Sequence, residues 1–116
     1  MLQFRTSIFA AAIVGVSLAL VAMPVQAQDA TIKLEMKDGV LTPNPLEVPA
    51  KKAFKLEIKN TGKTAAEFES KDLRKEKVVG PGKTVTIDFR PLDPGEYAYF
   101  DEYHEAMTKN AKIIAK

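Results

Sequence analysis

The sequence predicts a single all-β domain, built as a sandwich of about seven short strands. From residue 30 onward, apolar residues recur at every second position, which is the period of a strand with one buried face. Turn-forming residues interrupt this alternation roughly every eight to twelve positions. With 116 residues and no cysteine, the chain has room for one apolar core that no disulfide reinforces.

The first three expected strands are separated by turn signals at residues 38–39 and 60–62. Their apolar faces consist of Ile32, Leu34 and Met36, of Leu46 and Val48, and of Phe54, Leu56 and Ile58. The second of these strands lies between Pro45 and Pro49. Proline cannot donate to a strand ladder, so we expect this strand to be an edge strand or an irregular one.

The second half of the chain continues the alternation after the 60–62 turn. The remaining expected strands cover residues 66–70, 78–79, 85–89, 96–100 and 111–115. Residues 71–77 and 102–109 have room for helical turns, and neither segment is long enough for an independent helix. Short strands joined by tight turns favour an antiparallel sandwich.

The first 27 residues differ from the rest, because Arg5 is their only charge and residues 8–23 are apolar. Small residues stand at Val25 and Ala27, the −3 and −1 positions of a cleavage site. We therefore expect a secretory signal peptide over residues 1–27 and a mature domain over residues 28–116. A transmembrane anchor is the alternative, but the apolar stretch is shorter than the roughly 20 residues that span a bilayer.

Composition excludes several classes of function. The 17 basic and 15 acidic residues give a net charge of +2 and are spread along the chain without a basic run, which argues against nucleic acid as a partner. The absence of cysteine excludes a thiol nucleophile, an iron–sulfur cluster and a zinc ribbon. No catalytic triad, phosphate loop or HExxH motif is present, so any catalysis would be centred on a metal ion.

Two groups of side chains are candidates for chemistry. On the strand 66–70, the period of two places Glu67 and Glu69 on one face, about 7 Å apart, and Phe68 on the other. After the strand 96–100 follow Asp101, His104, the only histidine of the chain, and Met107. Each group also has a plain alternative, a solvated acidic face for the first and a surface histidine for the second.

The second group resembles the metal loop of cupredoxins, in which a strand with aromatic residues delivers Cys, His and Met at short spacing. In this chain Asp101 stands at the cysteine position, followed by His104 and Met107. The resemblance extends to residues 45–50, 54–60 and 81–84. It implies a Greek-key β-sandwich. Blue copper is excluded, because its thiolate is missing.

The combined pattern is similar to the periplasmic cupredoxin-like proteins of bacterial ferrous-iron uptake systems, the FtrB-like and EfeO-type group. The residues that carry this similarity are 68–70, 73, 76–79, 81–82 and the loop at 101. The resemblance implies a periplasmic protein that binds iron and copper, and the expected metal ligands are Glu67, Glu69, Asp101, His104 and Met107. Carboxylate oxygens suit iron or manganese, and imidazole with thioether suits copper.

Three functions remain open. In the first, the protein helps to oxidise Fe(II) beside an iron permease and other periplasmic uptake components. The second is a copper carrier without oxidase activity, and the third is a metal-free sandwich used for protein contacts. After cleavage we expect no membrane span, and we expect a monomer or a homodimer.

Overall fold

The computed structural model describes residues 3, 10–23 and 28–116, and ten short strands form a β-sandwich within this part of the chain. The strands are β1 (Ala30–Lys37), β2 (Val40–Thr42), β3 (Leu46–Val48), β4 (Phe54–Asn60), β5 (Ala66–Ser70), β6 (Lys75–Val79), β7 (Thr84–Phe89), β8 (Gly95–Ala98), β9 (Phe100–Asp101) and β10 (Lys112–Ala115). Between β9 and β10 lie the 3₁₀ helix η1 (Glu102–His104) and the single-turn helix α1 (Glu105–Thr108).

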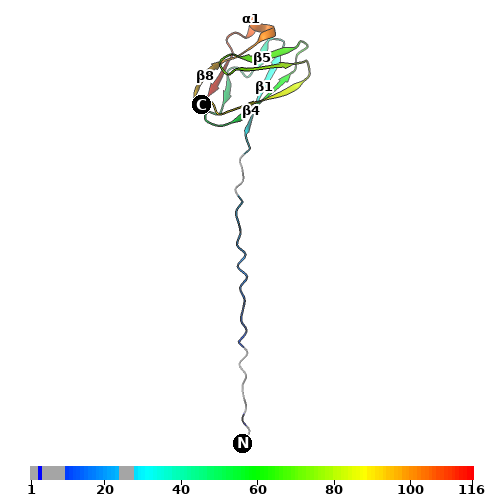
Figure 1. The fold of residues 1–116 in the computed structure, drawn as a ribbon. Helices are drawn as coiled ribbons and strands as arrows, with labels where there is room; N and C mark the ends of the chain where they lie inside the picture. Colours follow the sequence, from blue (N-terminus) through cyan, green and yellow to red (C-terminus); the bar gives the residue numbers. More distant parts are fainter. Residues whose placement is uncertain (1–2, 4–9, 24–27) are drawn as a thin grey trace.

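The strands form two layers, as the sequence predicts. One layer is a four-stranded sheet in the order β2-β1-β4-β7, and the other consists of two three-stranded sheets, β3-β10-β8 and β6-β5-β9. Because β8 and β9 are separated only by Tyr99, the chain passes directly from one small sheet to the other (Figure 1). The sheet order places β3 at an edge, which agrees with its flanking prolines.

Two details of the predicted sandwich are corrected. The structure has more strands than expected, because β2 was not recognised and the segment 96–100 divides into β8 and β9. The sandwich is also mixed rather than antiparallel, since β1 pairs with β4 and β3 pairs with β10 in parallel. Apolar alternation reports which face of a strand is buried, and it carries no information about the direction of the neighbouring strand.

The core lies between the layers and is built from alternate residues of the strands. On β4, for example, Phe54, Leu56 and Ile58 are buried and the side chains between them are exposed or half-buried. Phe54 stacks on Phe89 with ring centroids 4.8 Å apart, and Phe68 stacks on Tyr99 at 5.3 Å. Phe68 therefore anchors the middle of β5, with the residues on either side of it directed away from the core.

Of the two segments with room for helical turns, only residues 102–109 contain helix, as η1 and α1. The expectation was wrong for residues 71–77. Residues 71–74 form a turn, and β6 begins at Lys75 and pairs with β5 as a hairpin. Arg74 adopts a positive φ of 55° in this turn. The apolar pattern of β6 is weak, because only Val79 is buried.

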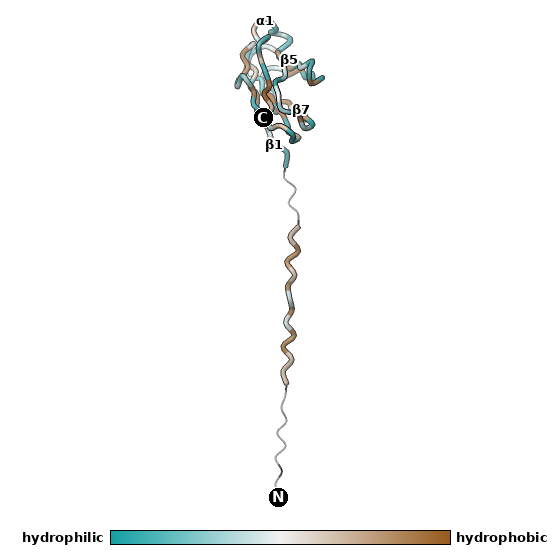
Figure 2. Tube along the Cα trace, turned by 90° about the vertical axis from the view of Figure 1, so that its left-hand side faces the viewer, coloured by the Kyte–Doolittle hydropathy of each residue, from teal (hydrophilic) through white to brown (hydrophobic). Residues whose placement is uncertain are grey.

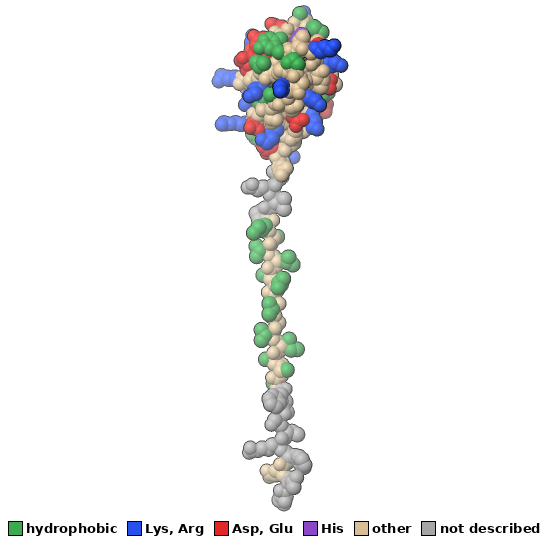
Figure 3. Space-filling model, turned by 90° about the vertical axis from the view of Figure 1, so that its right-hand side faces the viewer, with side chains coloured by type: hydrophobic (Ala, Val, Ile, Leu, Met, Phe, Trp, Pro, Cys, Tyr) green, Lys and Arg blue, Asp and Glu red, His purple; other side chains and the backbone are tan. Residues whose placement is uncertain are grey.

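Residues 10–23 form no helix or strand and are exposed to solvent. Figure 2 shows how strongly apolar this stretch is. The expected cleavage site at residues 25–27 lies outside the described residues. In the described residues, no helix is both long enough and apolar enough to cross a membrane. On the face of the domain that Figure 3 presents, basic and acidic side chains are interspersed.

Candidate metal centre

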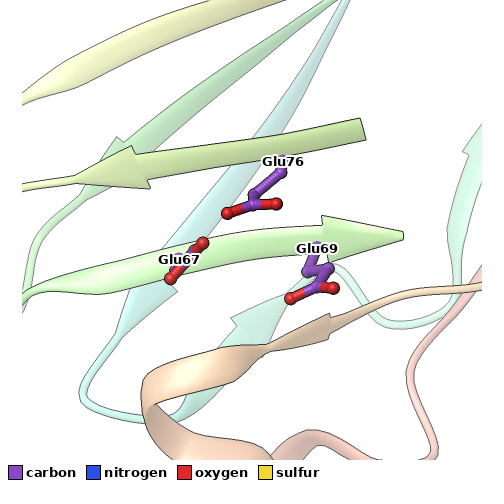
Figure 4. Close-up of side chains that lie close together, drawn as sticks. All are labelled: Glu67, Glu69 and Glu76. Carbon is purple, nitrogen blue, oxygen red and sulfur yellow. The ribbon is translucent and has the colours of Figure 1, made fainter. Parts of the chain in front are cut away.

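Three glutamates on the β5–β6 hairpin bring their carboxylates together (Figure 4). One oxygen atom of each of Glu67, Glu69 and Glu76 lies within 4.8 Å of the others. Glu67 and Glu69 share a face of β5, as the period of two predicts, and Glu76 on β6 lies directly across from Glu69. Glu67 is only 6% exposed, so this acidic group is not a fully solvated outer face.

Glu102, the first residue of η1, adds a fourth carboxylate to these three, and the four together are called the carboxylate cluster below. A hydrogen bond with the carboxyl group of Glu76, then burial, then the charge of Glu102 raise the pKa of Glu67 to about 7. A hydrogen bond with Glu102, followed by burial, raises the pKa of Glu69. Within the described part of the chain, no lysine or arginine forms an ion pair with Glu67. Glu67 therefore has no ion-pair partner that would offset the repulsion by the neighbouring carboxylates, whereas the charge of Lys71 acts on Glu69 and opposes the rise of its pKa.

The stability of the metal-free protein is expected to fall as pH rises from about 5 to about 8. Glu67 has a higher pKa in the folded chain than the ordinary value of 4.5, so between these values the folded state binds more protons than the unfolded state. The stabilisation is complete below the ordinary pKa and is lost as pH rises through about 7. Urea unfolding midpoints at several pH values, in the presence of a chelator, measure this slope. Glu67→Gln should flatten it, and an unchanged slope in that variant contradicts the assignment.

Asp101 lies immediately behind the carboxylate cluster and is fully buried. Its Oδ1 accepts hydrogen bonds from the backbone N–H of Glu67 at 3.0 Å and of Tyr103 at 3.1 Å. Its Oδ2 lies 2.8 Å from Nδ1 of His104. Asp101 thus caps the start of η1, ties this helix to β5 and contacts the histidine, all with one carboxylate.

The other ring nitrogen of His104 contacts a second loop. Nε2 lies 3.1 Å from Oγ1 of Thr64, and the Thr64 hydroxyl donates to Oδ1 of Asp38 at 2.7 Å. The same Asp38 oxygen accepts from the backbone N–H groups of Lys63 and Thr64. These hydrogen bonds, those from Thr64 first, hold the pKa of Asp38 below its usual value. We call Asp38, Thr64, His104 and Asp101 the histidine group.

Met107 on α1 lies beside the histidine group, packed on the turn between β1 and β2. A β-carbon added at Gly39 would lie 2.5 Å from Sδ of Met107 and 3.2 Å from Cβ of His104. The missing β-carbon of Gly39 therefore leaves room for the side chains of Met107 and His104. The φ of +85° at this position also favours glycine. Met107 is 63% exposed, so its thioether is accessible from solvent.

The structure places the five expected ligands in two neighbouring sets. Glu67 and Glu69 lie in the carboxylate cluster, and Asp101 and His104 contact each other, with Met107 next to the histidine. The sets adjoin, because the Glu67 backbone donates to Asp101. The sequence did not indicate Glu76 as a member. Its position follows from the hairpin register of β5 and β6. This hairpin was not expected, because helical turns were expected over residues 71–77.

Comparison with known proteins identifies the fold. The family model of the cupredoxin-like domain matches residues 9–115. An uncharacterized protein of Rickettsia prowazekii is 40% identical over 83 residues, a match that covers 72% of this chain and 66% of that protein. The chain thus spans slightly less than two thirds of the length of this relative.

Solved structures agree with the family match. The reduced auracyanin of Roseiflexus castenholzii superimposes with a TM-score of 0.62 at 16% identity, covering 78% of this chain and 99% of that one. The metal-binding domain of the Cu(I)-exporting P-type ATPase CopA of Streptococcus pneumoniae gives 0.60 at 12%, covering 74% and 84%. A purple cupredoxin from Nitrosopumilus maritimus gives 0.54 at 16%, covering 76% and 100%. At such low identities the likeness concerns the fold alone.

Proposed function

The chain belongs to the cupredoxin-like domain family, and on this premise we propose that it is an exported protein that binds ferrous iron and copper. The observation that carries the proposal is the carboxylate cluster, in which the nearly buried Glu67 faces two other carboxylates and forms no ion pair with a lysine or arginine of the described residues. Buried carboxylates are ordinarily paired or bind a cation. We further propose that the domain works in the periplasm, after cleavage of residues 1–27.

The residues present fit a metal ion of a different kind from blue copper. No thiolate is available, so the intense colour and the fast electron transfer of a blue-copper site are excluded. Glu67, Glu69 and Glu76, with Glu102 beside them, would hold a hard cation such as iron through oxygen. Several carboxylates stabilise the higher charge of Fe(III) over Fe(II) and so favour oxidation of bound iron.

Copper is assigned to the other set of donors. His104 supplies a borderline nitrogen and Met107 a soft thioether, and the two side chains lie together against Gly39. Copper(II) bound there would supply the acceptor for the electron from iron. In this proposal the protein assists both the oxidation of ferrous iron and its delivery to an iron permease and the associated uptake components.

Metal titration of purified protein tests the proposal. The double variant Glu67→Gln/Glu69→Gln should bind Fe(II) and Mn(II) about 100-fold more weakly than wild type, equivalent to about 2.7 kcal/mol, because two of the carboxylate charges are removed. Glu57→Gln, a half-buried glutamate on β4, is the matched control and should bind normally. Unchanged affinity in the double variant would refute the carboxylate cluster as the metal centre.

A copper carrier without oxidase activity is the second candidate, favoured by the adjacency of His104 and Met107. Oxygen consumption after Fe(II) is added to copper-loaded protein separates the two functions. An iron oxidase raises the rate above that of the free metals, and a carrier leaves it unchanged.

A further inference from the structure

A pocket of about 350 Å³ adjoins the carboxylate cluster at the turn of the β5–β6 hairpin. Two of its lining residues, Glu69 and Glu76, belong to the cluster, and three others are basic. The basic residues are Lys71 and Arg74 of the turn and Lys75, the first residue of β6. The pocket therefore combines two carboxylates of the candidate metal centre with a group of cations.

The basic side chains lie near the carboxylates without pairing with them. Nζ of Lys71 stands over the ring of Phe100, 5.8 Å from its centroid, and Phe100 lies directly across from Glu69 in the β5–β9 ladder. The turn brings Arg74 beside Lys71, because the backbone N–H of Arg74 donates to the Lys71 carbonyl oxygen at 3.3 Å. In the part of the chain that the structure describes, none of the three basic residues forms an ion pair.

This combination is poorly suited to a bare metal ion. Positive charges beside a cation site oppose the binding of the cation, so Lys71 and Arg74 gain nothing from a metal ion alone. The three glutamates of the cluster offer one oxygen atom each, and octahedral oxygen coordination is typical of ions such as Mn²⁺. Coordination positions therefore stay open for oxygen atoms that the glutamates do not supply.

An anion with several carboxylate groups satisfies both sides of the pocket. One of its groups completes the coordination of the metal ion, and another pairs with the basic residues, since guanidinium binds carboxylate in a bidentate manner. The volume of the pocket lies within the range of small-molecule sites, roughly 300–1,000 Å³.

We propose that this pocket binds a small polycarboxylate anion of the citrate class, which joins Lys71 and Arg74 to a metal ion held by the carboxylate cluster. The proposal rests on the metal-binding function proposed above and names the form in which the metal is bound, a chelate with the anion. Each charge in the pocket then has an opposite charge beside it.

Manganese(II) titrations with and without citrate test the inference, compared at equal concentrations of free Mn(II). Citrate should raise the affinity of wild type for Mn(II) about 10-fold, the size of one charge-assisted hydrogen bond. Lys71→Gln/Arg74→Gln should bind Mn(II) alone at least as tightly as wild type and should lose the gain from citrate. Lys77→Gln/Arg90→Gln removes the same charge at two exposed positions outside the pocket, and this matched control should keep the gain.

The affinity for citrate provides a reciprocal measurement, because Mn(II) must raise it by the same factor. A wild type for which citrate only competes for Mn(II), or a gain that persists in Lys71→Gln/Arg74→Gln, overturns the inference. The proposed metal centre fails separately, if Glu67→Gln/Glu69→Gln retains its affinity for Mn(II) measured without citrate.

Discussion

Asp101→Ala is expected to lower the free energy of unfolding by about 3–5 kcal/mol, the loss typical when one partner of a buried pair is removed. The carboxylate is fully buried and serves three groups, the backbone N–H of Glu67, the backbone N–H of Tyr103 and the ring of His104. Alanine leaves all three without their partner. The free N–H groups alone cost about 1–3 kcal/mol each when they stay buried.

Asp101→Asn separates the structural role of this side chain from its role toward metal. The amide oxygen can still accept from both backbone N–H groups, and the amide nitrogen can donate to Nδ1 of His104. We therefore expect a loss below about 1.5 kcal/mol, within the range of one hydrogen bond, together with loss of copper binding at the histidine. Urea unfolding of the metal-free proteins and copper titration measure the two effects. Equal stability losses in the two variants would show that Asp101 acts through its charge alone.

Much of this fold could be predicted from the alternation of apolar residues. The buried faces of β1, β3, β4 and β7 agree with it, because period-two burial is a local property of a strand. Pairing depends on distant residues, and the parallel pairs β1–β4 and β3–β10 could not be predicted in this way. The strand β6 was not recognised over its full length, because most of its side chains are charged and only Val79 is buried.

In the candidate site, too, residues placed by a single strand could be predicted, and residues placed by distant pairing could not. Glu67 and Glu69 could be placed on one face, because they are two residues apart on a single strand. Glu76 joins them through the register of a hairpin, and Thr64 reaches His104 across 40 positions of sequence. Short polar residues in turns are common in any sequence. The sequence pattern therefore does not distinguish Asp38 and Thr64 from other turn residues.

Asn60→Ala should reduce the free energy of unfolding by about 2–4 kcal/mol, because it removes three hydrogen bonds from a fully buried position. The side-chain Nδ2 donates to the carbonyl oxygens of Thr64 and Val79, both at 2.9 Å, and Oδ1 accepts from the backbone N–H of Gly62 at 2.9 Å. Asn60 thereby joins the end of β4, the end of β6 and the loop that carries Thr64. Urea unfolding compares this variant with Asn110→Ala, an exposed asparagine whose replacement should cost less than about 0.5 kcal/mol.

Asn60→Asp sharpens the comparison, because it preserves the shape of the side chain and removes its donors. A carboxylate facing the carbonyl oxygens of Thr64 and Val79 is repelled by both, so the loss should be at least as large as for alanine. Because Asn60 also holds the loop whose Thr64 contacts the ring of His104, both variants should weaken copper binding at the histidine. Normal copper affinity in a destabilised Asn60→Ala protein would contradict a role of this loop in holding His104 for the metal.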